Sequence, residues 1–381
     1  VRSMPRVVWI VLAGTFVNRF GSFVMPFLAI YLTRQGYSVA QAGFAVSAYG
    51  AGHLMASMLG GFLADRIGRR NTIAVSMFAS AATMVALSQA DSYAAIVAIT
   101  VLAGAASELY RPAAGALIGD LVPPEKRITA FALYRFAVNL GFAAGPATAG
   151  LLAGRSFLYL FLGDAITSVV YGLIALLLLP HGVRSTAKEE EGEGAMRHAL
   201  RNRAFVFFLA ATVCVTWVEF QIHSTLPLYL TSLGFSPRDY GLLLSFNGVM
   251  IVLFELAITS WTQRFAPRSM IALGYGLAAA GVAMTGLARG MPALAMTVVV
   301  WTLGEMIYAP VTGAYVTNLA PERYRGRYHG MWVQMWSLGM LTGPSIGSWL
   351  FSRNPQSLWI ACAVIGSVGA VLPLTRSQRE R

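Results

Sequence analysis

The order of apolar and polar residues divides the chain into about twelve hydrophobic runs separated by short polar gaps. The runs cover approximately residues 7–32, 39–63, 72–89, 93–119, 129–153, 157–179, 205–230, 239–262, 270–288, 292–318, 328–351 and 357–374. Most are close to the ~20 residues that an α-helix needs to cross a bilayer. The pattern therefore predicts an all-α membrane protein with twelve spans. The first run is too long for a signal-peptide core, so we expect it to be retained as the first span.

Composition supports a protein that lies almost entirely in the membrane. Of the 381 residues, 56% are apolar and 12% are charged, about half the charged share of an average soluble domain. These values exclude a soluble enzyme and a disordered chain. The two cysteines, Cys214 and Cys362, lie far apart in apolar runs and predict neither a disulfide framework nor a metal site. We expect no cofactor and no bound metal.

The basic residues gather in alternate gaps between the runs. If the N-terminus is cytoplasmic, 20 of the 28 Lys and Arg residues fall on the cytoplasmic side, five fall on the other side and three lie within runs. The positive-inside rule then places both termini in the cytoplasm. We interpret the net charge of +12 as topology in a bacterial inner membrane, with the lipid bilayer as partner, and not as a surface for nucleic acid.

The second half of the chain repeats the first with an offset of 198 residues. The repeated positions include Leu28, Tyr31, Gly36, Gly43, Tyr110, Pro112, Gly141 and Pro146, which match Leu226, Tyr229, Gly234, Gly241, Tyr308, Pro310, Gly339 and Pro344. Registered Gly and Pro matches are more specific than shared apolar composition and indicate an internal duplication. We expect two six-helix halves, 1–180 and 204–381. The polar, Glu-rich stretch 181–203 is expected to be a cytoplasmic linker between them.

The gap between the second and third runs contains a distinctive motif. Its sequence is Gly61-Phe62-Leu63-Ala64-Asp65-Arg66-Ile67-Gly68-Arg69-Arg70, which resembles the cytoplasmic loop signature of the major facilitator superfamily. The resemblance implies twelve helices in two halves and transport by alternating access. Gly68 would permit a tight turn, while Asp65 would form ion pairs with the arginines. In that family an acid at the position of Asp120 pairs with arginines such as Arg69 or Arg70.

A second motif occurs in both halves. Gly141-x-x-x-Gly145-Pro146 and its repeat Gly339-x-x-x-Gly343-Pro344 resemble a motif of proton-coupled antiporters in the same superfamily. Glycines four residues apart let helices approach closely, so tight packing is an alternative explanation. Thr100 stands where those antiporters have an arginine.

Four spans that line the central cavity in the resembling family each carry an ionisable residue here. These residues are Arg19, the pair Glu108 and Arg111, Glu219 and Glu305. Charge inside a membrane costs about 3 kcal/mol on insertion scales, so each such residue indicates a partner, a cavity or a function. Glu108 and Arg111 are three residues apart and share a helix face. They form either a permanent ion pair or, if Arg19 competes for Glu108, a site with one arginine free for an anionic substrate group.

The C-terminal half has acids without a Lys or Arg in their own spans, namely Glu219, Glu255 and Glu305. Several efflux members of the superfamily use an acid in helix seven together with one in helix ten, the helices that contain Glu219 and Glu305 here. All three acids are candidate proton or substrate sites, with Glu255 nearer the cytoplasmic end of its span. His223, one turn after Glu219, is a candidate relay. Asn18, beside Arg19, stands where family antiporters commonly place an acid.

Aromatic and methionine side chains accompany these acids and are candidates for lining a substrate cavity. They are Trp217, Trp301, Met306, Tyr308, Trp332 and Trp336. Aromatic rings beside carboxylates suit a lipophilic or cationic guest, although helix packing would explain any one of them equally well.

The sequence therefore predicts a secondary transporter that works as a monomer and exports amphipathic or cationic compounds in exchange for protons. The alternative is proton-coupled uptake of a small nutrient such as a peptide or an organic anion. No catalytic motif of a membrane enzyme is found in the sequence.

Overall fold

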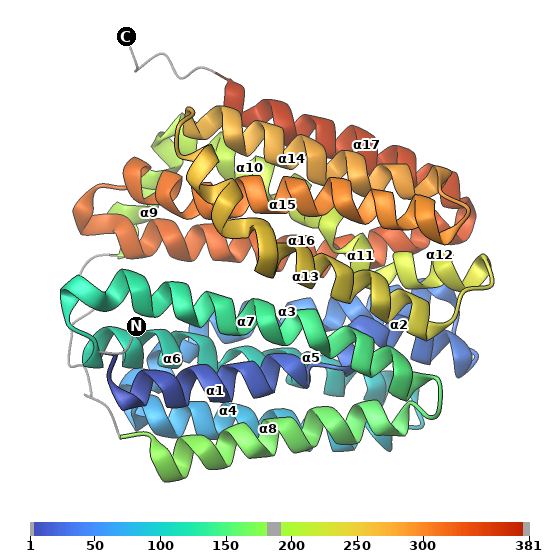
Figure 1. The fold of residues 1–381 in the computed structure, drawn as a ribbon, viewed down its shortest axis with the longest axis horizontal. Coiled ribbons are helices and arrows are strands. Elements are labelled where there is room, and N and C mark those ends of the chain that lie inside the picture. Colours follow the sequence, from blue (N-terminus) through green and yellow to red (C-terminus); the bar gives the residue numbers. More distant parts are fainter. Residues whose placement is uncertain (1–3, 181–191, 376–381) are drawn as a thin grey trace. The chain divides into compact units, whose positions relative to one another are not determined.

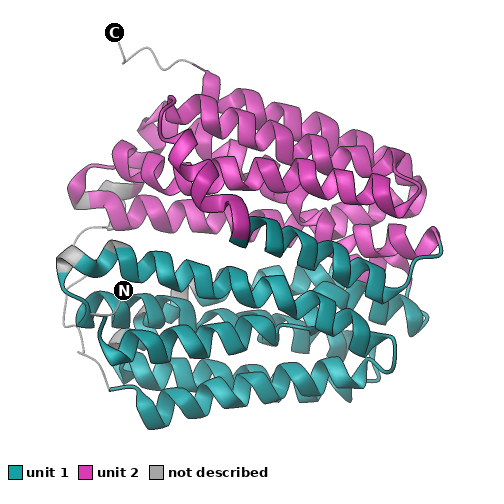
Figure 2. Cartoon of the chain, viewed as in Figure 1, with its two compact units in different colours: residues 1–37, 44–187, 234–252 teal, residues 38–43, 188–233, 253–381 magenta. Residues whose placement is uncertain are grey.

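The computed structural model describes residues 4–180 and 192–375, and the described residues are almost entirely helical (Figure 1). They form two compact units (Figure 2). Unit 1 contains residues 1–37, 44–187 and 234–252, and unit 2 contains residues 38–43, 188–233 and 253–381. Residues 181–191, most of the predicted linker before Gly192, lie outside the described part of the chain.

Among the described residues, the first half of the chain supplies eight helices. They are α1 (Arg6–Phe20), α2 (Val24–Arg34), α3 (Val39–Ile67), α4 (Arg69–Ser88), α5 (Tyr93–Glu108), α6 (Tyr110–Leu121), α7 (Pro124–Ala153) and α8 (Leu158–Leu178). Within unit 1, α4 packs against α5 and α8, and α1 packs against α7 and α8. Tyr110 and Tyr171 are fully buried in its core, where their rings meet edge to face.

The described part of the second half, residues 192–375, supplies nine helices and three short 3₁₀ turns. They are α9 (Gly192–Arg201), α10 (Arg203–Glu219), α11 (Gln221–Ser224), α12 (Leu226–Ser232), α13 (Pro237–Thr262), α14 (Pro267–Met284), η1 (Thr285–Leu287), α15 (Met291–Leu319), η2 (Glu322–Tyr324), α16 (Arg325–Arg353), α17 (Pro355–Val371) and η3 (Leu372–Leu374). Within unit 2, α14 packs against α15 and α17, and α10 packs against α16. The core contains Phe205, Phe208, Tyr275 and Tyr308.

The helices match the hydrophobic runs. Within the described residues, ten helical segments are long and apolar enough to cross a membrane. The other two predicted spans, 39–63 and 328–351, fall within the 29-residue helices α3 and α16. The all-α prediction is confirmed, and the helix ends differ from the predicted run ends by a few residues.

Two glycines related by the repeat have the same unusual backbone. Gly36 and Gly234 have φ angles of +90° and +86°, a conformation that residues with a Cβ rarely adopt. Each follows the helix that ends the first span of its half. The repeat is therefore visible in backbone geometry as well as in sequence.

Three of the predicted spans are interrupted. The first breaks between Phe20 and Val24, the fourth at Leu109, and the seventh at Phe220 and Thr225. Pro112 explains the break at Leu109, because a proline nitrogen cannot donate to the carbonyl four residues earlier, which belongs to Glu108. Its repeat partner Pro310 lies inside α15, which continues through it from Met291 to Leu319.

Candidate functional site

Unit 1 contains a cluster of four ionisable side chains around Glu108. Arg19 Nη2 lies 3.3 Å from Glu108 Oε1. On the other carboxylate oxygen, Arg111 Nε lies 3.2 Å from Oε2 and His53 Nε2 lies 3.4 Å from it. The Glu108 side chain is 9% exposed. Three donors from α1, α3 and α6 therefore share one carboxylate at the end of α5.

Close backbone contact between α3 and α5 brings His53 to Glu108. A Cβ atom on Gly52 would overlap the carbonyl oxygen of Val101, and one on Gly104 would overlap that of Tyr49. The Tyr49 hydroxyl also hydrogen-bonds to Ser107. Because His53 follows Gly52 and Glu108 lies one turn after Gly104, the glycine pair positions both side chains.

Arg19 is held by its neighbours on two sides. Its guanidinium lies over the Tyr110 ring, 5.7 Å from the ring centroid, a favourable cation–π arrangement. A Cβ on Gly141 of α7 would come within 2.8 Å of the Arg19 Cβ. The predicted candidate Asn18 is buried but turns away from the cluster, donating to the sulfur of Met77 at 3.4 Å.

Unit 2 contains a carboxylate bound to a tyrosine. The Tyr308 hydroxyl donates to Glu219 Oε1 at 2.6 Å, a short distance typical of a hydroxyl donating to a carboxylate. Tyr308 is 2% exposed, and its ring meets that of Tyr275 edge to face. Glu305, one turn before Tyr308 on α15, is half-buried and within electrostatic range of both Glu219 and Tyr308. The two acids predicted as the proton site therefore lie near one another in unit 2.

The other predicted polar candidates of unit 2, His223 and Glu255, lie on different helices from Glu219 and Tyr308. His223 is on the four-residue helix α11, with its ring centroid 6.3 Å from that of Phe220. Glu255 is half-buried on α13. Of the aromatic and methionine candidates, Trp217, Trp301 and Met306 are buried, while Trp332 and Trp336 are half-buried. Their role in a substrate cavity stays a prediction.

The repeated glycine motif makes close helix contacts inside each half. Gly145 of α7 lies against the carbonyl of Phe20. In α16, a Cβ on Gly339 would overlap the side chain of Thr216, and Gly343 accepts a hydrogen bond through its carbonyl from Gln221 Nε2 at 2.9 Å. Pro146 and Pro344 lie inside helices that stay continuous. Tight packing is therefore one function of this motif, and its link to antiport stays a prediction.

The loop motif forms a tight turn and an ion pair. Gly68 has a φ of +89°, as the predicted turn between α3 and α4 required. Arg69 Nε lies 3.5 Å from Asp120 Oδ2, the pair that the family resemblance implied, and Arg70 donates to Asn71. Arg66 lies over the Phe62 ring. Gly61 and the backbone of Asp65 belong to α3, and the side chain of Asp65 lies outside the described part of the chain.

Replacing Asp120 by asparagine is expected to lower the stability of unit 1. The Arg69 side chain is 8% exposed, and removing an acidic partner from a largely buried charge is costly. Because Asp120 itself is 29% exposed, we expect a loss of about 1 kcal/mol, measured as a lower midpoint of thermal unfolding in detergent. Glu322→Gln is the matched control, since Glu322 is 90% exposed and 3.9 Å from Arg325. Equal midpoints for both variants would contradict the prediction.

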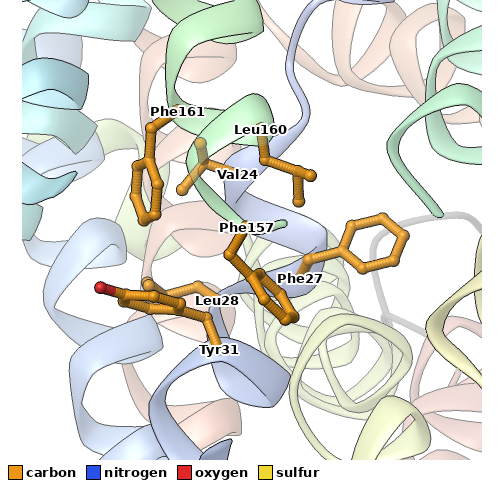
Figure 3. A pocket seen from close by; sticks show the side chains of 7 residues that line it. All are labelled: Val24, Phe27, Leu28, Tyr31, Phe157, Leu160 and Phe161. Carbon is orange, nitrogen blue, oxygen red and sulfur yellow. The ribbon is translucent and has the colours of Figure 1, made fainter. Parts of the chain in front are cut away.

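A small pocket in unit 1 lies between α2 and α8 and is apolar. Figure 3 shows its lining residues, which are Val24, Phe27, Leu28, Tyr31, Phe157, Leu160 and Phe161. The Tyr31 ring packs against Phe157 and Phe161 at centroid distances of 5.5 and 5.0 Å. None of the lining residues is ionisable except Tyr31, so we interpret the pocket as a packing feature and not as the transport site.

Comparison with known proteins identifies the family. The model of the Major Facilitator Superfamily matches residues 11–239 and 224–381. The chain therefore belongs to this superfamily of membrane transporters. It is a multi-pass membrane transporter and not an enzyme, as the sequence predicted.

Two bacterial relatives and one solved structure resemble the chain over most of its length. The Na(+), Li(+), K(+)/H(+) antiporter of Planococcus maritimus is 27% identical and the match covers 86% of this chain and 85% of the relative. The quinolone resistance protein NorA of Staphylococcus aureus (strain Mu50) is 21% identical, with 94% and 92% covered. The crystal structure of a POT family transporter in complex with a thioalcohol-conjugated peptide has a TM-score of 0.83 at 18% identity, covering 97% of this chain and 95% of the other. This last likeness concerns the fold.

Proposed function

We propose that the chain is a proton-coupled antiporter that exports amphipathic or cationic small molecules. The observation that carries this proposal is the hydrogen bond between Tyr308 and Glu219 inside unit 2, with Glu305 within electrostatic range. Ionisable side chains in membrane spans are costly and typically mark ion or substrate pathways.

The two acids provide a site where a proton and a cation can exchange. Neighbouring carboxylates repel each other, and one positive charge offsets that repulsion. A proton on Glu219 or Glu305 supplies this charge in one step of the cycle, and a cationic substrate supplies it in another. Protonation on the outer side would release the substrate, and release of the proton on the inner side would restore the site.

The relatives favour antiport over uptake. One is described as a monovalent cation/proton antiporter and another as a quinolone resistance protein. Both descriptions fit a carrier whose central acids bind protons and cations in turn.

The proposal is tested in liposomes that contain the purified protein and a pH-sensitive dye, with the interior acidified. A lipophilic cation, a fluoroquinolone, Na⁺, a dipeptide and an organic anion are added in separate experiments. We expect the lipophilic cation or the fluoroquinolone to collapse the gradient, and the double variant Glu219→Gln, Glu305→Gln not to respond. A collapse of equal rate in the double variant would reject these acids as the proton site.

The alternative is proton-coupled uptake of a peptide or an organic anion, and the arginine-rich cluster around Glu108 favours it. Under this alternative, only the dipeptide or the anion would move protons, and they would move them in the same direction as the substrate. That result would replace the antiport proposal.

A further inference from the structure

The Glu108 cluster contains more positive charge than negative charge. The guanidinium groups of Arg19 and Arg111 face a single carboxylate. The cluster therefore has a net charge of +1 when His53 is neutral and +2 when it is protonated. An uncompensated charge inside a membrane span is costly unless a partner or a ligand offsets it.

The cluster also has more hydrogen-bond donors than its carboxylate can accept. The Arg19 side chain is 12% exposed, and its Nε atom is buried without a hydrogen-bond partner among the described residues. Arg111 contacts Glu108 through Nε, and its side chain is 49% exposed, so its two Nη atoms can reach a further acceptor. Buried donors are normally satisfied, so an orphaned one is a reason to look for a missing acceptor.

The surrounding groups do not supply that acceptor. Tyr49, Tyr110 and Tyr134 lie within electrostatic range of Arg19, but a phenol hydroxyl carries no formal negative charge to offset a guanidinium. Asp164 is also within range of Arg19, but its Oδ2 atom accepts from the backbone nitrogen of Val24 at 3.3 Å. It therefore holds the start of α2 and does not contact the guanidinium groups.

We propose that Arg19, Arg111 and His53 form a binding site for one carboxylate, or a similar singly charged oxyanion, on the transported molecule. The inference rests on the proposed transport function and narrows the amphipathic substrates to those that carry one anionic group, alone or together with a cationic group. The planar fork of a guanidinium matches a carboxylate through two parallel hydrogen bonds. Arg111 is 49% exposed, so its Nη atoms are accessible to a ligand, whereas Arg19 fixes Glu108 from the buried side.

Glu108 has a defined role in this site. It orients Arg19, Arg111 and His53 toward one point and neutralises one of the two guanidinium charges. A substrate carboxylate competes with Glu108 for these donors. Glu108 therefore positions the donors but lowers the affinity of the site for the substrate carboxylate. If the cluster were only a structural ion pair, removing the Glu108 charge would destabilise unit 1 and would not strengthen anion binding. A binding site and a structural ion pair therefore predict opposite effects of Glu108→Gln on anion binding.

The experiment measures binding without transport. The thermal unfolding midpoint of the purified full-length protein is followed by tryptophan fluorescence in a non-ionic detergent, with increasing benzoate, benzyl alcohol or benzylammonium. These probes share one ring and differ in charge, and the rise in midpoint with concentration reports affinity. The proteins are the wild type, Arg111→Gln, Arg111→Lys, Glu108→Gln and Arg135→Gln. Arg135 is not among the partners of Glu108 and controls for the loss of one arginine from unit 1.

We expect benzoate to stabilise the wild type at lower concentration than benzyl alcohol or benzylammonium. Arg111→Gln should weaken the apparent benzoate affinity about tenfold, with a smaller loss for Arg111→Lys, because lysine keeps the charge but loses the fork. Glu108→Gln should strengthen benzoate binding several-fold, and Arg135→Gln should match the wild type.

Three results would overturn the proposal. They are an equal response to benzoate and benzyl alcohol, a wild-type benzoate response in Arg111→Gln, and weaker benzoate binding in Glu108→Gln. The double variant Glu219→Gln, Glu305→Gln should keep the benzoate response. Failure of the proton-coupling proposal would therefore leave this test unaffected, and failure of this test would leave the coupling proposal standing.

Discussion

Replacement of Glu219 by glutamine is expected to abolish proton-coupled transport while leaving the protein folded. In the wild type, the Tyr308 hydroxyl lies 2.6 Å from the Glu219 carboxylate. Glutamine keeps the size of the side chain and an oxygen that can accept this hydrogen bond, but it cannot exchange a proton. Positioned proton-transfer groups typically contribute 10²–10⁴-fold to a rate, so we expect the substrate-driven proton flux to fall by at least about 10²-fold. The measurement is the initial rate of dye response in liposomes at matched protein content.

Tyr308→Phe and Glu322→Gln complete this test. Tyr308→Phe removes the hydroxyl that stabilises the carboxylate, an interaction worth about 1.5–3 kcal/mol for a charged acceptor, and should reduce the flux about tenfold or more without abolishing it. Glu322→Gln makes the same chemical change at a side chain that is 90% exposed and should leave the flux unchanged. If Glu219→Gln transports protons like Glu322→Gln, the proton site lies elsewhere.

The fold was predictable because the bilayer imposes a simple length rule. A span needs about 20 apolar residues, and the hydrophobic runs meet this requirement so clearly that the helices fall where the pattern indicates. The internal repeat was also predictable, because Gly36 and Gly234 occupy equivalent sequence positions. The structure adds that both have a left-handed backbone conformation. The length of each apolar run and the internal repeat can both be detected by inspecting the sequence alone. Neither requires knowledge of tertiary contacts.

The partners inside the candidate site were only partly predictable. The pair Glu108 and Arg111 follows from helical spacing, and the structure places them together. His53 was missed, although a histidine in the middle of an apolar run was a signal that could have been used. Its contact with Glu108 depends on the close approach of α3 and α5 at Gly52 and Gly104, which is a tertiary contact that spacing within one helix cannot reveal.

The repeat explains why the two halves differ chemically. Tyr110 and Tyr308 occupy equivalent positions, yet Tyr110 lies under the Arg19 guanidinium whereas Tyr308 donates to Glu219. In the repeat, Arg19 corresponds to Trp217 and Arg111 to Ala309. One inherited tyrosine framework thus supports a cationic cluster in unit 1 and an acidic pair in unit 2. The two halves share the fold, and the charges that define each site occur in one half only.

Replacement of Gly104 by alanine is expected to destabilise unit 1 by about 1–3 kcal/mol, because extra atoms in a packed interior force backbone shifts. The added Cβ would overlap the carbonyl oxygen of Tyr49, and a backbone atom in a helix cannot rotate away as a side chain can. The expected result is a lower midpoint of thermal unfolding and a weaker benzoate response, since Glu108 lies one turn away and moves with α5.

Gly119→Ala is the matched control for this substitution. Gly119 belongs to the same predicted span as Gly104, but a Cβ there would meet nothing within 4 Å. Alanine is favoured over glycine in a helix by up to about 1 kcal/mol, so Gly119→Ala should be neutral or slightly stabilising. If both variants unfold at the wild-type midpoint, the contact between α3 and α5 does not hold the cluster together. In that case the approach of His53 to Glu108 must depend on the ion pairs themselves.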